Sequence, residues 1–419
     1  MELTEHFFRE EAGRLVPALT RLFGLHNLAL AEDVAQDALC QALEVWKHRG
    51  IPADPRAWLL TAAKHRAIDI LRRERKRLAF APDLAFLLES EWTLAPAVAE
   101  RFGPDALRDD QLRMMFSCCH PKLSEDARVA LVLHLLCGFG VGEIAAAFLS
   151  GRAAIEKRLT RAKRVLARSK SLFDLRQDDV MPRLESVHRA LYLLFSEGYH
   201  GAHPETSVRR DLCVEALRLV SLLGQDPIAA TPATDALAAL MCFHASRLPG
   251  RLDAGGELTS LTEQDRSRWD RDLIAEGHRL LERAWDRAEP QARGPFHFEA
   301  AIAGAHASAR TAEATPWPAI VALYDGLMHL RPSPVVALNR AVAIAQADGP
   351  EKGLAAIEAI ADRDALKGYP FYAATLAELE LRRGQTRAAQ AHFQDALRLA
   401  RNPMEKSFLE KRAALAAQR

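Results

Sequence analysis

Residues 55–77 read PRAWLLTAAKHRAIDILRRERKR, and this segment points most directly to the fold class. Wound as a helix at about 100° per residue, it gathers apolar side chains on one arc and polar ones opposite. From Arg56 to Arg77 it carries eight Lys or Arg against two acids, a net charge of +6. Such charge density repels itself unless a polyanion is near, and nucleic-acid phosphate is the natural one. The segment therefore predicts an amphipathic helix that binds nucleic acid.

The two faces of this helix are well separated. The predicted apolar arc consists of Leu60, Ala63, Ala67, Ile68, Ile70 and Leu71. The opposite side consists of His65, Arg66, Asp69, Arg72, Arg73 and Lys76. Lys64 falls near the apolar margin, where its long stem can run outward to solvent.

Positive charge is concentrated in the first 170 residues. A second basic segment, residues 152–170, holds eight Lys or Arg against Glu156, a net charge of +7. Because the whole chain carries only +1, everything outside the two basic segments sums to −12. This layout is typical of a DNA-binding front half joined to a protein-binding back half.

The composition is that of an ordinary soluble protein. The 419 residues suffice for two or more domains, with 49% hydrophobic and 26% charged residues. The start, MELTEHFFREE, lacks the apolar core of a signal peptide, and no run of about 18 apolar residues predicts a membrane span. Six cysteines in so long a chain do not form a disulfide framework. These features predict a cytoplasmic protein without membrane contact.

Helical periodicity and the absence of β-branched alternation predict an all-α fold. Helices are expected at roughly 3–24 and 28–48, followed by a turn at 50–55 and the basic helix. The segment after residue 78 contains Pro82, Pro96 and Pro104 and reads as a tether with short helical pieces, and helices resume from Asp109. The predicted domains are residues 1–78, a linker at 79–108, a second helical domain at 109–172 and a third at 180–419.

Residues 142–168 have the pattern of a helix-turn-helix. A short helix at 142–148 and a turn at 149–151 precede a longer basic helix, and Gly151 is suited to a left-handed conformation in the turn. The predicted buried stripe of the second helix consists of Ile155, Leu159, Ala162 and Leu166. The side chains left for the DNA groove and phosphates are Arg152, Glu156, Lys157, Arg161 and Lys163.

The third domain contains a repeat. The segment that starts at Pro334 aligns with the one that starts at Pro370, and Gly349 and Gly384 occupy the same inter-helix turn. A spacing of about 34 residues with small residues at helix contacts is the tetratricopeptide signature. The pattern predicts an α-solenoid that binds a protein or peptide.

The sequence offers no catalytic or metal constellation, and no cofactor is expected. The neighbours Cys118 and Cys119 do not have chelating CxxC spacing, and His297, Glu299 and His306 do not have HExxH spacing. Packing roles are predicted for all five. An enzyme built on the helical back half is therefore the weakest of the functional classes.

Three ordered motifs resemble the extracytoplasmic-function sigma factors of bacterial RNA polymerase. Residues 31–46, AEDVAQDALCQALEVW, are similar to the family's regions 2.1–2.2. Residues 57–77 resemble regions 2.3–2.4, and residues 143–166 resemble region 4.2. The paired cysteines of FSCCHP, and back-half segments such as FSEGYHG and QDRSRWDRDLI, resemble the subgroup with a C-terminal tetratricopeptide-like extension.

The resemblance implies a role for each front segment. Glu32, Asp33, Gln36 and Asp37 lie on the helix that, in such factors, docks on the clamp helices of the polymerase β′ subunit; the β flap is the other expected polymerase contact. Lys64, His65, Arg66, Arg72, Arg73 and Lys76 would melt and hold the −10 element. Arg152, Glu156, Lys157, Arg161 and Lys163 would grip the −35 element. Trp58, a tempting base-stacking residue, is placed by the resemblance in the core.

Two positions depart from the family pattern. Lys64 and His65 stand where many members have Arg-Asn, and Glu156 stands where a basic or small residue is common. An acid in a recognition helix repels phosphate but accepts a hydrogen bond from cytosine N4.

The sequence predicts a transcription initiation factor without catalysis of its own. Its partners would be core RNA polymerase, promoter DNA and a protein partner on the tetratricopeptide-like domain, which would regulate or support activity. The alternative is a polymerase-independent helix-turn-helix regulator with a helical sensor domain. The helix at 31–46 separates the two, because a plain regulator has no reason to carry it.

Overall fold

The computed structural model describes residues 5–74, 98–100, 102–148, 150–168, 177–200, 208–253, 255, 257–400 and 403–417. Within these ranges the regular elements are helices, and β pairing is limited to one isolated bridge between Leu252 and Leu258. The all-α prediction is therefore confirmed. The chain divides into two compact units, unit 1 (residues 1–194 and 225–229) and unit 2 (residues 195–224 and 230–419).

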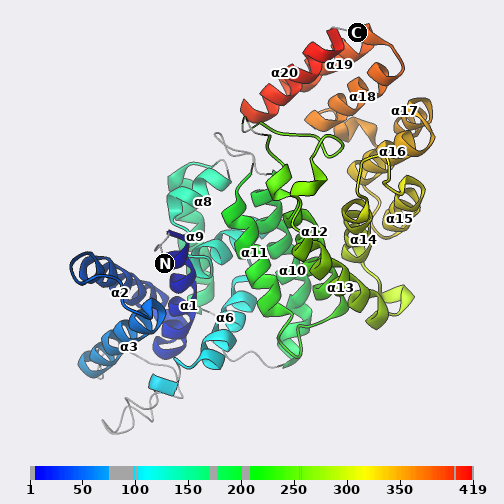
Figure 1. Ribbon diagram of the computed structural model, residues 1–419. Helices are drawn as coiled ribbons and strands as arrows, with labels where there is room; N and C mark the ends of the chain where they lie inside the picture. The colour runs from blue at the N-terminus through cyan, green and yellow to red at the C-terminus, as the bar shows by residue number, and fades with distance from the viewer. Residues whose placement is uncertain are drawn as a thin grey trace. The chain divides into compact units, whose positions relative to one another are not determined.

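Unit 1 begins with three helices, here called the front module (Figure 1). They are α1 (Glu5–Phe23), α2 (Leu28–Arg49) and α3 (Pro55–Glu74). Aromatic side chains hold one end together, with the rings of Trp46 and Trp58 meeting edge to face at 5.4 Å. The chain leaves α2 through Gly50, whose φ of 78° favours glycine, and Asp54 Oδ1 accepts the Ala57 N–H at 3.0 Å where α3 begins.

The apolar arc of α3 is confirmed with a small rotation. Leu60 and Ile70 are half-buried rather than buried, and Leu59 is fully buried in their place. The buried side chains of the helix after its first turn are Leu59, Ala63, Ala67, Ile68 and Leu71. The rotation follows from packing, because α3 contacts both α2 and α1.

Four further helices of unit 1 form what we call the second module. They are α6 (Pro104–Cys118), α7 (Glu125–Leu135), α8 (Val141–Ala147) and α9 (Arg152–Arg168). Helix α6 begins at Pro104, five residues before the expected start, because a proline suits the first helical position. The expected packing roles of Cys118 and Cys119 agree with the structure, since both are fully buried.

The helix-turn-helix prediction is confirmed in α8 and α9, including the buried stripe of α9. The expectation for Gly151 is wrong, because Gly151 is not among the described glycines with positive φ. Its carbonyl instead accepts the N–H groups of Ala154 at 2.9 Å and Ile155 at 3.2 Å. Gly151 therefore caps the start of α9 rather than forming a left-handed turn.

The front and second modules share a packed contact along α1. A Cβ added to Gly13 would lie 1.9 Å from the backbone oxygen of Leu136, so only glycine allows this approach. The buried Gln111 side chain donates to Gly13 O at 3.1 Å from α6. Unit 1 is thus one compact packed body. Most of the predicted linker, residues 79–108, lies outside the described residues.

The long helix α10 (Gln177–His200) runs from unit 1 into unit 2, and the remaining helices belong to unit 2. These are α11 (Arg210–Leu223), α12 (Pro232–Ser246), α13 (Arg271–Arg287), α14 (Pro295–Ser308), α15 (Trp317–Leu330), α16 (Pro334–Asp348), α17 (Pro350–Glu358), α18 (Pro370–Arg382), α19 (Thr386–Arg398) and α20 (Pro403–Ala417). From α11 onward each helix packs against the next one in sequence (Figure 1). Sequential pairing of this kind is the architecture of stacked helical repeats.

The predicted repeat corresponds to two helix pairs, α16–α17 and α18–α19. Gly349 and Gly384 lie in the equivalent turns with φ of 101° and 77°. Both turns need a positive φ, which explains why glycine recurs at this position.

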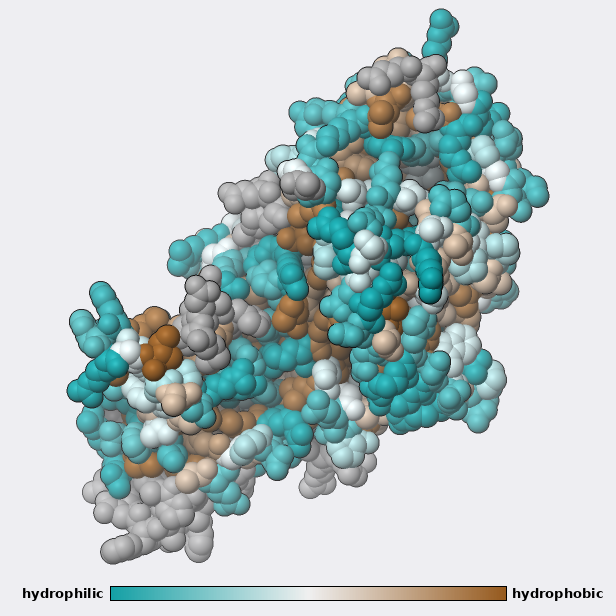
Figure 2. Space-filling view, viewed as in Figure 1, coloured by the Kyte–Doolittle hydropathy of each residue, from teal (hydrophilic) through white to brown (hydrophobic). Residues whose placement is uncertain are grey.

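The visible surface is mostly hydrophilic, with hydrophobic patches between the hydrophilic residues (Figure 2). Two large exposed hydrophobic side chains of the front module are Leu43 of α2 and Ile51 of the turn between α2 and α3. Among the described helices, none is long and apolar enough to cross a membrane.

Candidate nucleic-acid interface

The polar face of α3 is open to solvent. His65, Arg66, Arg72 and Arg73 are exposed, and Lys64 is half-buried at the margin of the apolar stripe, as its position predicts. Lys76 lies outside the described residues. Arg66 is anchored by an ion pair across to α2, with Nη2 3.1 Å from Asp37 Oδ2. The remaining cations of this face point away from the core.

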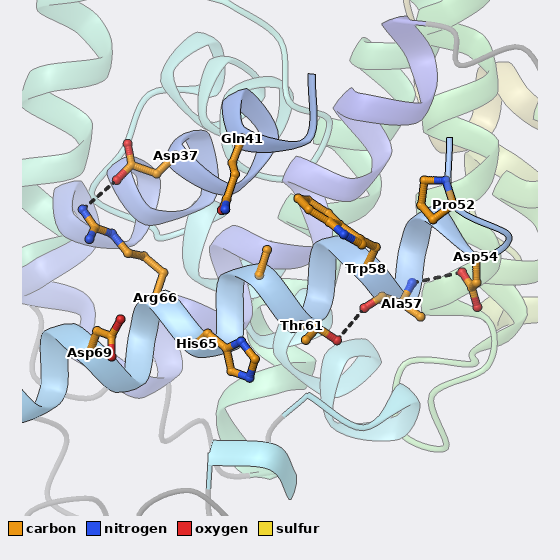
Figure 3. Close-up of a pocket in the computed structure, with 11 residues that line it drawn as sticks. Asp37, Gln41, Pro52, Asp54, Ala57, Trp58, Thr61, His65, Arg66 and Asp69 are labelled. Carbon is orange, nitrogen blue, oxygen red and sulfur yellow. Dashed lines mark hydrogen bonds and ion pairs between the residues drawn. The ribbon is translucent and has the colours of Figure 1, made fainter. Parts of the chain in front are cut away.

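An open pocket of about 750 Å³ lies beside this basic face (Figure 3). Three segments form it, namely α2, the turn before α3, and residues 57–69 of α3. Its lining residues are Asp37, Gln41, Pro52, Asp54, Ala57, Trp58, Thr61, Ala62, His65, Arg66 and Asp69. The volume lies within the range of about 300–1,000 Å³ typical of pockets that hold small organic molecules.

Trp58 has two environments. One edge packs against the buried cluster of Phe7, Trp46 and Leu59, as expected for a core residue. The side chain is nevertheless only half-buried and lines the pocket. The core prediction is therefore correct for one side of the ring, and the other side faces the pocket.

Helix α9 presents its predicted groove residues to solvent, with one exception. Arg152, Glu156, Lys157 and Arg161 are exposed. Glu156 Oε1 accepts from Arg152 Nε at 3.2 Å, one helical turn away, so the Glu156 carboxylate and the Arg152 guanidinium partly neutralise each other's charge. Lys163 is the exception, because it is half-buried and points into unit 1.

Lys163 makes an ion pair with Glu32, a residue of the acidic α2 face. Lys163 Nζ lies 2.5 Å from Glu32 Oε1, and His134 Nε2 lies 2.9 Å from the same oxygen. Burial raises the pKa of Glu32, but the hydrogen bonds from His134 and Lys163 outweigh it and hold that pKa below its ordinary value. Asp33, Gln36 and Asp37 remain exposed on the same helix.

A second ion pair supports this contact between the modules. Arg9 Nη2 of α1 lies 2.5 Å from Glu143 Oε1 of α8, and the Arg9 guanidinium stacks over the Phe139 ring at 4.5 Å. Gly138, with φ of 67°, lets the backbone before α8 approach Arg9 closely. No local pattern predicts these pairs, because the partners are 134 and 131 residues apart.

Residues 7–77 match the family Sigma-70 region 2, and residues 113–166 match Sigma-70, region 4. Residues 183–285 match a family of unknown function, DUF6596. An uncharacterized protein of Rhizobium meliloti (strain 1021) is 38% identical over 395 residues, covering 94% of this chain and 90% of that protein. The chain belongs to the sigma-70 family of RNA polymerase sigma factors. No solved structure matches it.

This sigma factor is of the extracytoplasmic-function type with a C-terminal extension. Its family implies core RNA polymerase and promoter DNA as partners, and sigma factor families are not enzymes. The match to region 2 covers α1–α3, which a plain helix-turn-helix regulator would lack. The match to the family of unknown function begins in α10 and ends in α13.

Proposed function

We propose that the exposed acidic face of α2 docks on the clamp helices of the polymerase β′ subunit. Asp33, Gln36 and Asp37 present two carboxylates and an amide to solvent, which suits a basic partner. Asp33→Arg is expected to weaken capture of core polymerase at least tenfold in a pull-down titration. Asp105→Arg reverses an exposed acid on α6 and serves as the control. Equal capture by the two variants would reject this docking face.

The pocket between α2 and α3 would hold one unstacked base of the melted −10 element. The observation that carries this assignment is an open pocket with an aromatic wall, Trp58, directly beside exposed cations. Stacking compensates for unpairing, and the α3 cations, with Lys76, would hold the strand backbone. Base identity would depend on His65, which lines the pocket where many relatives have Asn.

His65 offers a direct test of this pocket. After start sites are mapped, His65→Asn is expected to change which base is preferred at one −10 position while leaving duplex −35 binding unchanged. Melting is followed by 2-aminopurine fluorescence in the −10 element. The same preference in both proteins would remove His65 from base reading.

Helix α9 would read the −35 element as duplex. Arg152 and Lys157 are exposed in the N-terminal half of the helix, the part that faces base edges in helix-turn-helix complexes, and Arg161 is exposed one turn after Lys157. Glu156 would accept from cytosine N4 once Arg152 turns to phosphate. The second module would also contact the polymerase β flap.

The closed arrangement of unit 1 would have to open when both promoter elements are bound. By their labels, −35 and −10, the elements lie about 25 base pairs apart, and at about 3.4 Å per pair this is roughly 85 Å. Glu32 and Lys163, assigned to polymerase and DNA respectively, lie 2.5 Å apart in unit 1. Polymerase binding to α2 would therefore compete with the ion pair and release Lys163 for phosphate.

Unit 2 would be a tetratricopeptide-like domain that supports or regulates polymerase engagement. Its sequentially paired helices and recurrent turn glycines favour a repeat architecture with a protein or peptide partner. Deletion of residues 180–419 is expected to change promoter-dependent run-off transcription at equal sigma concentration. Unchanged transcription would reject a supporting or regulatory role.

A further inference from the structure

We propose that unit 2 contains a binding site for a small anion, built around Arg247 and Arg251. Arg247 follows α12 directly and is only 6% exposed. Arg251 lies four residues later and is half-buried. This inference does not depend on how unit 1 binds polymerase or promoter.

Three arginines surround two buried aromatic rings in this region. The Arg251 guanidinium carbon lies 4.4 Å from the centre of the Tyr199 ring, and that of Arg247 lies 5.8 Å from the same ring. Arg247 and Arg266 both face the Trp269 ring, at 6.0 Å and 5.0 Å. Tyr199 and Trp269 are 4% and 2% exposed, so this cationic cluster lies inside the unit rather than on its surface.

No carboxylate balances Arg247 or Arg251 within the described ranges of the chain. Arg247 contacts His244 Nδ1 and the Tyr199 side chain, and burial is the main cause that lowers its pKa. The Nε atoms of both arginines are buried and have no hydrogen-bond partner. Arg266 differs, because it donates to backbone oxygens of His306 and Ala309 and to the Thr315 hydroxyl.

The same unit neutralises buried charge elsewhere. Asp235 is 1% exposed and pairs with both Arg283 and Arg287. Contacts with aromatic rings and an imidazole nitrogen offset less than the desolvation of a guanidinium, so Arg247 and Arg251 lack the compensation that Asp235 receives. An anion would supply it through charge-assisted hydrogen bonds to the two unpaired Nε–H groups.

The anion must be small. Arg247 is too deeply buried for a macromolecular surface to reach, and Arg251 is only half-buried, which leaves a small ion a way in. The chemistry fits a carboxylate or a phosphate group, both of which accept from guanidinium N–H groups.

The backbone that positions Arg251 is held from two sides. Thr259 donates its N–H to Arg251 O at 3.0 Å and its hydroxyl to Gly250 O at 2.8 Å. Helix α20 holds the same loop, with Arg412 Nη1 2.6 Å from Glu263 Oε1. The guanidinium of Arg251 is thus presented by a braced loop, which favours a preformed receptor.

The test uses the full-length protein with inorganic phosphate and succinate as probes, at ionic strength matched with chloride. One or both probes are expected to raise the melting temperature of unit 2 saturably and to bind one to one by calorimetry. Response to phosphate alone assigns a phosphorylated ligand, and response to succinate alone assigns a carboxylate. If neither probe raises the melting temperature more than chloride does, the proposal is overturned.

Variants locate the site. Arg251→Gln is expected to weaken probe binding at least tenfold without changing the circular dichroism spectrum. Arg268→Gln alters an exposed arginine of the same segment and is expected to leave probe binding unchanged. In the absence of probe, Arg251→Gln should melt no lower than the parent, since it removes an uncompensated charge. Equal affinity of the parent and Arg251→Gln would place the anion elsewhere and overturn the assignment.

Discussion

The ion pair between Glu32 and Lys163 is expected to hold the front and second modules of unit 1 together. Lys163→Met removes the ammonium group but keeps an apolar stem of similar reach. The two side chains are 20% and 26% exposed, so water replaces the lost contact poorly. A hydrogen bond to a charged group contributes about 1.5–3 kcal/mol, which corresponds to about 10- to 150-fold in an opening equilibrium.

Hydrogen exchange followed by mass spectrometry measures this opening in the full-length chain. Amides of α9 are expected to exchange about 10- to 150-fold faster in Lys163→Met. Asp37→Asn is the matched control, because its pair with Arg66 is 57% and 45% exposed and contributes at most about 1 kcal/mol. Acceleration of less than about threefold, or no greater than in the control, would refute the reasoning.

The pH dependence of the same contact has a defined sign. The folded-state pKa of Glu32 lies below its ordinary value of 4.5. The unfolded chain therefore binds the proton first as the pH falls, so the contribution of Glu32 is fully present above pH 4.5. It is lost as the pH falls through the lowered pKa, and Glu32→Gln removes this dependence.

Three further predictions concern unit 2, with stability followed by urea unfolding. Asp235→Ala should lower the free energy of unfolding by about 2–3 kcal/mol, because it removes the acceptor of two arginines. Arg287→Ala should lower it by about 1 kcal/mol or less, since Asp235 keeps its other partner, Arg283. Gly349→Ala should cost about 1–3 kcal/mol because its φ of 101° is strained for alanine, while Gly368→Ala, in open space, should be neutral or slightly stabilising. Burial lowers the pKa of His306 from 6.5 to about 3, so between these pH values the unfolded chain binds more protons than the folded chain. Stability should therefore fall by up to about 1.4 kcal/mol per pH unit as the pH drops from 6.5, and His306→Gln should flatten that slope. An unchanged slope in His306→Gln, or equal costs within either matched pair, would contradict the respective assignment.

Local patterns predicted the helices well because each depends on residues within a few turns. The stripe of α9, from Ile155 to Leu166, follows from spacing alone and is buried as predicted. Details that depend on neighbours were less accurate. The buried face of α3 is turned toward Leu59 by contact with two helices, and Gly151 caps α9 because the turn follows a different path from the expected one.

The sequence by itself determined the all-α class, the basic helices, the helix-turn-helix and the repeat in unit 2, because periodicity, charge and turn glycines are local properties. Only the tertiary structure showed that Lys163, predicted to bind DNA, pairs with Glu32, predicted to bind polymerase. It also brought Arg247 and Arg251 together around Tyr199 without an acid from the described residues. Such contacts depend on long-range packing, which brings together residues that are far apart in the sequence and follow no regular spacing.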